Sequence, residues 1–135
     1  MIDIENDVYD HAESALKAAH GDIYVTSEYV QAPSEFPAVS IVEMNNMVYE
    51  RARTRNIENA ARVTFECNVY SNKAANKKSE AKEIAATLDD AFSSIGFTRT
   101  FKNPVPNMMD ASIYRIVLRY EAIVDKDLWI YHNNT

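Results

Sequence analysis

The chain has 135 residues, of which 47% are apolar and 25% charged, with a formal net charge of −6, one cysteine and two glycines. This length is enough for one domain with its own core, and we expect a single domain over residues 1–135. The acidic net charge argues against a dedicated nucleic-acid binder. The scarcity of glycine argues against a phosphate-binding loop. Because Cys67 is the only cysteine, no disulfide can form within the chain.

The first predicted element is a helix over residues 4–19. Asp3 can cap its start, and Gly21 can close its end in the left-handed conformation. Its apolar residues recur at the three- and four-residue spacing of one helix face: Ile4, Val8, Ala12, Ala15, Leu16 and Ala19.

Two strands are predicted next, in "DIYVTSEYVQ" and over residues 38–44. Pro33 and Pro37 bracket the connection between them, and we expect the two strands to pair as a hairpin. Residues 45–60 show no clear period. This polar, arginine-rich stretch is predicted to be a long loop, and loops of this length are typically functional or disordered.

A strand over residues 62–70 and a helix over residues 76–95 follow. The strand alternates strictly, with Val63, Phe65 and Cys67 on one face and polar residues on the other. The helix is predicted to bury a stripe of six residues and to end at Gly96: Ala81, Ile84, Ala85, Leu88, Phe92 and Ile95. We interpret the strand as a sheet edge that this helix holds rigid.

Two more strands complete the predicted fold. The first, in "FTRTFKNPVPN", ends at Pro104 and Pro106, and the second, over residues 111–124, is the longest in the chain. Two helices cannot cover both faces of such a sheet. We therefore expect an α+β fold in which a mixed, mostly antiparallel sheet of four to five strands carries both helices on one face. The other face is then left for water or a partner.

The residue types that carry catalysis or bind metals do not form a recognisable site. His11, His20 and His132 share no ligand spacing with Cys67, so no metal is expected. Cys67 lies in phase with the apolar face of its strand and is predicted to be a core residue. No nucleophile elbow, zinc-protease motif or phosphate-binding loop occurs. We therefore expect a protein without a catalytic site or a cofactor.

Three segments are candidates for contacts with other chains. The loop arginines Arg51, Arg53 and Arg55 can form an ordered arm that reaches a neighbouring subunit, or a solvated loop. On the longest strand, charged and branched apolar residues alternate on the face away from the predicted core. This pattern is also found on the solvent-exposed face of an antiparallel sheet. We favour a surface that contacts another chain, formed by Arg115, Val117, Arg119 and Glu121.

The C-terminal cluster formed by Leu128, Trp129 and Tyr131 is the third candidate. Packing back onto the sheet is favoured for it over a role as a partner anchor.

The order of these segments is similar to that of a known family. An acidic first helix is followed by "QAPSEFPAVSIVEMNN", by the loop rich in Arg and Asn, by "VTFECNVYSNKAANKKSEAKEIAATLDDAFSSIGF" and by "FTRTFKNPVPNMMDASIYRIVLRYEAIVD". In this order the chain resembles the tail-terminator (tail-completion, minor capsid-like) proteins of long-tailed bacteriophages. The resemblance covers nearly the whole chain and rests on element order, because the family has no catalytic motif. No functional residue is carried over by motif.

The resemblance implies a structural protein of the virion tail or neck, assembled in the host cytoplasm. Such subunits form a hexameric ring on the last ring of tail tube protein, stop tube polymerisation, and offer the opposite surface to a head-completion or connector protein. Genome DNA passes through the ring without sequence-specific binding, and no membrane is involved. A net negative charge suits such a conduit, because phosphates are repelled; a strongly basic lumen would contradict this hypothesis.

Three alternatives remain open at this point. The chain can be a head-completion or neck connector subunit, which would occur in the same compartment as a tail terminator and would also form an oligomer. It can also be a small α+β ligand-binding domain or enzyme, for which a deep pocket with clustered polar groups would be expected. A reader of single-stranded nucleic acid would use Tyr114, Tyr120 and Phe65 as stacking platforms, but these residues fall on predicted core faces and the overall charge is wrong.

Overall fold

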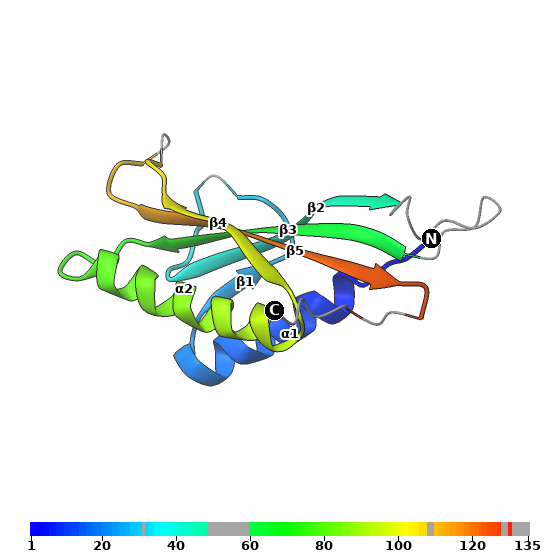
Figure 1. Cartoon of the computed structure of the whole chain (residues 1–135). Coiled ribbons are helices and arrows are strands. Elements are labelled where there is room, and N and C mark those ends of the chain that lie inside the picture. The colour runs from blue at the N-terminus through cyan, green and yellow to red at the C-terminus, as the bar shows by residue number, and fades with distance from the viewer. Residues whose placement is uncertain (31, 49–59, 108–109, 128–129, 131–135) are drawn as a thin grey trace.

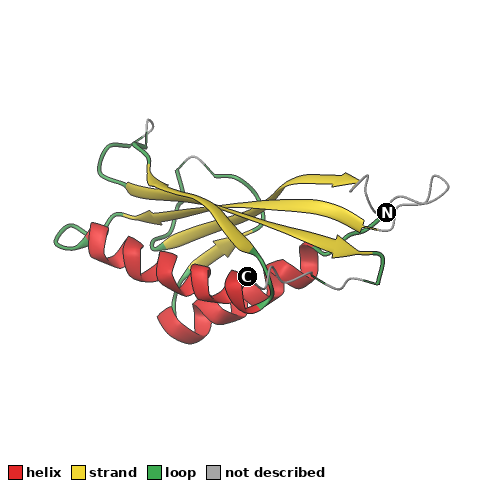
Figure 2. Ribbon diagram, in the orientation of Figure 1, coloured by secondary structure: helices red, strands yellow, loops and turns green. Residues whose placement is uncertain are grey.

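In the computed structural model the chain forms two layers, a twisted sheet and a pair of helices that cover one of its faces (Figures 1 and 2). The structure describes residues 1–30, 32–48, 60–107, 110–127 and 130. These residues form, in chain order, α1 (Glu5–His20), β1 (Tyr24–Thr26), β2 (Ala38–Val48), β3 (Ala60–Ser71), α2 (Lys77–Ser94), β4 (Thr98–Pro104) and β5 (Tyr114–Asp125). The predicted α+β class is confirmed.

The strand order across the sheet is β1-β2-β3-β5-β4, with β1 parallel to β2 and every other pair antiparallel. β3 is therefore the central strand, and its interpretation as a sheet edge was wrong. Its twelve residues pair with β2 on one side and with β5 on the other. Within the part of the chain that is described, no helix is long and apolar enough to cross a membrane.

Helix α1 runs from Glu5 to His20, one residue later at each end than predicted, and its N-cap residue is Ile4, not Asp3. The Asp3 carboxylate accepts a hydrogen bond from the backbone N–H of Glu5 (3.1 Å). At the other end, the N–H of Gly21 donates to the carbonyl of Lys17, and Gly21 adopts a φ of +65°, which glycine tolerates best. The helix buries Val8, Ala12 and Leu16, and Ile4 just before it is buried too, but Ala15 is half-buried and Ala19 is exposed. Only one row of the predicted stripe reaches the core.

Helix α2 is anchored at its C-terminal end by a Schellman motif. The N–H of Phe97 donates to the carbonyl of Phe92 (3.0 Å) and that of Gly96 to the carbonyl of Ser93 (3.1 Å), with Gly96 at a φ of +94°. The rings of Phe92 and Phe97 meet edge to face at 5.4 Å. Phe92 also stacks on Tyr120 of β5 at 4.3 Å. The helix end is thus joined directly to the sheet.

The core lies between the helices and the sheet. On β3 the alternation predicted from the sequence is confirmed, because Val63, Phe65 and Cys67 are fully buried on the helix side. These residues pair with Ala122, Tyr120 and Leu118 of β5, which face the same way. The other face of the sheet is covered by neither α1 nor α2 and is called the helix-free face below.

β1 and β2 do not form the predicted hairpin. They run parallel, with Tyr24, Val25 and Thr26 opposite residues 38–40. The connection crosses the helix-free face instead of turning back, as the light-blue loop above the sheet in Figure 1 shows. It is held there by a second, small apolar cluster, in which Phe36 packs with Ala38, Tyr70 and Ile113.

The stretch predicted as a loop over residues 45–60 begins as a strand. β2 continues to Val48, paired with β3, and a bulge lies between Glu43 and Asn45. A bulge inserts one residue and exchanges the two faces. The alternation of residues 38–44 is therefore lost beyond the bulge, which explains why the sequence shows no period there. Residues 49–59 lie outside the described part.

Candidate interaction surfaces

A ladder of polar cross-strand contacts runs along the helix-free face between β3 and β5. The Nε of Arg115 donates to Oδ1 of Asn68 (2.8 Å), and the Nε of Arg119 donates to Oε2 of Glu66 (3.0 Å). Farther along, the Nε of Arg62 lies 3.5 Å from Oε1 of Glu121. The two ion pairs stabilise the sheet modestly because their side chains are partly exposed and water screens them.

The connection between β1 and β2 covers one end of this ladder. The guanidinium carbon of Arg115 lies 5.7 Å from the ring centroid of Tyr29 and 6.0 Å from that of Tyr70. The hydroxyl of Tyr70 donates to the carbonyl of Val30. Burial raises the pKa of this hydroxyl, so it stays protonated and keeps its role as a donor. The side chain of Arg115 therefore makes its contacts within its own subunit.

Of the four contact residues predicted on β5, Val117 is buried, and Arg115, Arg119 and Glu121 are half-buried. Val117 is only 4% exposed and adds almost nothing to the surface. Arg119 and Glu121 are half-buried, and Arg119 lies over the ring of Phe101 on β4 at 5.1 Å. A partner role for this face stays a prediction.

The other predicted contact residues lie outside the described part of the chain. They are Arg51, Arg53, Arg55, Leu128, Trp129 and Tyr131. Their described neighbour Ile130 forms an isolated bridge with Val124 at the end of β5 and packs against the main core.

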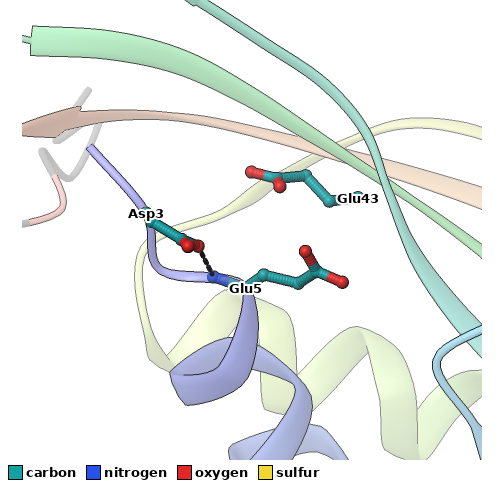
Figure 3. A group of neighbouring side chains, drawn as sticks. All are labelled: Asp3, Glu5 and Glu43. Carbon is teal, nitrogen blue, oxygen red and sulfur yellow. Dashed lines mark hydrogen bonds between the residues drawn. The ribbon is translucent and has the colours of Figure 1, made fainter. Parts of the chain in front are cut away.

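An acidic cluster that sequence reasoning missed lies where α1 begins (Figure 3). Carboxylate oxygens of Asp3, Glu5 and Glu43 lie within 4.8 Å of one another. Glu43 comes from β2, and its Oε1 accepts a hydrogen bond from Nδ2 of Asn46 (3.3 Å), which also donates to the carbonyl of Ile2 (2.7 Å). The sequence shows acidic residues near α1 but does not show that β2 brings a third carboxylate to them.

The three carboxylates of this cluster repel one another when they are ionised. Burial raises the pKa of the Glu43 carboxyl, and the neighbouring carboxylates of Glu5 and Asp3 raise it further, although the hydrogen bond from Asn46 acts in the opposite direction. A hollow of about 320 Å³ opens beside it, lined by Met1, Ile2, Asp3, Glu43, Asn46 and Val48. A cationic group that entered this hollow would be stabilised.

His11 and Cys67 have structural positions, whereas His132 lies outside the described residues. The Nε2 of His11 lies 3.1 Å from the carbonyl of Ala91 and 3.0 Å from Oγ of Ser94, so this ring links α1 to α2. Cys67 is fully buried, and burial raises the pKa of its thiol. The prediction of a core cysteine is confirmed. Phe65 and Tyr120, considered above as stacking platforms, are also buried in the core.

Comparison with known proteins supports the fold rather than a family assignment. No protein-family model matches the sequence, and no curated protein matches it. Among solved structures, the fold is similar to that of a chain in the "Virion of native gene transfer agent (GTA) particle". The match has a TM-score of 0.63 and 18% sequence identity, and covers 90% of this chain and 94% of the other. At this identity the likeness concerns the fold.

Proposed function

We propose that the chain is a structural protein of a phage-like virion, without catalytic activity. The observation that carries this proposal is the fold match over nine-tenths of both chains with a component of a gene transfer agent particle. The match extends nearly from end to end, so it concerns the whole domain and not a common substructure. Fold alone does not fix function, and the proposal therefore needs a direct test.

Within the virion we propose the role of a tail terminator. Six copies would form a ring on the end of the tail tube, stop tube polymerisation, and present the opposite surface to the head-completion or connector protein. DNA would pass through the ring without sequence-specific contacts. The net charge of −6 supports this last point, because a surface of matching sign does not retain phosphates. The sequence resemblance described above supports the tail position.

The test is binding to purified tail tubes from the phage or phage-like particle that encodes the chain. A tail terminator is expected to bind one end of each tube and to stop its elongation when tube protein is added. A neck connector, the rival role in the same particle, would bind purified portal or connector rings and leave tubes free to grow. Binding to neither assembly would contradict the virion role.

A further inference from the structure

Two edges of the sheet carry backbone groups without a strand partner among the described residues. β1 covers only residues 38–40 of β2, so no described strand pairs with that side of β2 from Ile41 to Val48. The outer side of β4 is not paired with any described strand along its whole length, Thr98–Pro104. An open edge presents a row of N–H and C=O groups to which another strand can bind.

The two open edges also carry exposed apolar side chains. Met44, Met47 and Val48 on β2 are 45%, 53% and 42% exposed, and Phe101 on β4 is 37% exposed. The sheet register places Met47, opposite Arg62, and Phe101, opposite Arg119, on the helix-free face. The two edges thus have apolar groups on the same side of the sheet.

On the helix side of the sheet the two edges carry opposite charge. Glu43 pairs with Phe65 and therefore points toward the helix side, where Asp3 and Glu5 add two carboxylates. On β4, Arg99 and Lys102 are opposite core residues of β5 and also point to the helix side. Arg99 already bonds Asp89 at 3.2 Å, whereas Lys102 is exposed at the edge.

The strand directions agree with a direct match between the edges. Three antiparallel pairings separate β2 from β4, so β4 runs opposite to β2. A second copy placed in the same orientation would therefore set its β2 antiparallel to the β4 of the first. The open lengths also agree, because eight residues of β2 and seven of β4 span about 27 Å and 24 Å at about 3.4 Å per residue.

We infer that the chain binds a second copy of itself by pairing the β4 edge of one subunit with the open β2 edge of the next. In this arrangement Lys102 enters the acidic hollow beside Glu43 on the helix side, and Phe101 packs near Met47 on the other. The contact is head-to-tail, and such a contact gives a closed ring when the rotation between neighbouring subunits divides a full turn. This inference rests on the proposed function, because it says how the ring is built.

The same edges protect the free subunit from indiscriminate pairing. Lys102, Pro104 and the irregularity near Thr100 on β4, and the bulge on β2, are features that discourage strand addition. Only an edge with complementary charge and a matching irregular register overcomes them. The pairing is therefore selective for another copy of this chain.

The test uses two charge reversals, Glu43→Lys and Lys102→Glu, each in the full chain. Alone, each variant brings like charges together at every contact, and we expect the concentration needed for assembly to rise at least about tenfold. In an equimolar mixture, the lysine introduced on β2 of one variant meets the glutamate introduced on β4 of the other, and the remaining contacts are those of the original chain. Assembly should then return to near the original concentration in rings whose two variants alternate.

Matched controls separate the edge from overall charge. Lys73→Glu and Glu28→Lys change the charge equally at exposed positions outside both edges and should assemble normally. Thermal unfolding checks that each variant is folded. If a variant does not fold, Met47→Cys and Phe101→Cys replace the pair, and their oxidised mixture should contain disulfide-linked dimers. The buried Cys67 does not compete in this reaction.

The outcomes separate this inference from the proposed function. Normal assembly of both single variants, or a mixture that fails to recover, would overturn edge pairing even if the original chain forms rings and stops tube growth. An original chain that stays monomeric at its highest soluble concentration would overturn the inference as well. The tail-tube assay would then judge the function independently.

Discussion

The packing of the C-terminal end of α2 against the sheet should depend on one side chain, that of Phe92. This ring is 1% exposed and contacts three other aromatic rings, with Tyr120 stacked at 4.3 Å and Phe97 and Phe65 at 5.4 Å and 5.9 Å. Replacing a buried phenylalanine by alanine costs about 3–5 kcal/mol, and the lost aromatic contacts, about 0.5–1.5 kcal/mol each, place Phe92→Ala toward the upper end. That is a large share of the roughly 5–15 kcal/mol typical of a domain.

Urea denaturation followed by circular dichroism measures this cost from the midpoint at constant slope. Phe92→Leu keeps much of the buried area and should lose about 1–2 kcal/mol, so it remains measurable if the alanine variant is too unstable. Phe101→Ala is the matched control at an exposed position and should cost about 1 kcal/mol or less. A Phe92→Ala variant that loses under about 2 kcal/mol would refute the view that this aromatic cluster joins the helix to the sheet.

Three further predictions concern other parts of the fold. Tyr70→Phe removes the hydroxyl that donates to Val30 and should lower the free energy of unfolding by about 1 kcal/mol in urea denaturation; an unchanged midpoint would contradict this. Because the pKa of Glu43 is raised in the folded chain, the folded state binds its proton more tightly than the unfolded state does. The stability contributed by this group therefore increases as the pH falls through the folded pKa, and Glu43→Gln should raise the thermal midpoint at neutral pH but not in acid. Cys67 should react with a thiol reagent only after unfolding, since burial raises the pKa of its thiol, and labelling of the folded chain at the rate of a free thiol would be inconsistent with its position.

Much of the fold could be predicted because its patterns are local. The four-residue repeat of α1, the apolar stripe of α2 and the alternation around Phe65 each lie within one element, and two glycines mark the helix ends. Burial follows such periods whenever an element lies on one side of a core. The two-layer arrangement then follows from the number of helices and strands.

Strand direction and strand position could not be predicted in the same way. A short run such as Tyr24–Thr26 has the same alternation in a parallel and an antiparallel pair. Its direction is set by the connection to β2, which crosses the helix-free face because Phe36 packs with Tyr70 and Ile113, residues far along the chain. The central position of β3 likewise depends on β5, a strand more than forty residues away.

The acidic cluster and the extent of β2 were missed for physical reasons that can be named. The bulge between Glu43 and Asn45 shifts the alternation by one residue, so the second half of β2 has no visible period. The same bulge follows directly on Glu43, which lies beside Asp3 and Glu5. A contact between the N-terminus and the middle of the chain produces no recognisable pattern in a single sequence.

The molar mass of the original chain in solution, measured by light scattering over a wide concentration range, tests the central claim most directly. Head-to-tail pairing of the two sheet edges predicts a closed ring, and six subunits of 15.4 kDa give six times that mass, about 92 kDa. A species that reaches this mass and grows no further would agree with ring closure. A mass of 15.4 kDa at every concentration, or an open-ended series of larger species, would contradict it.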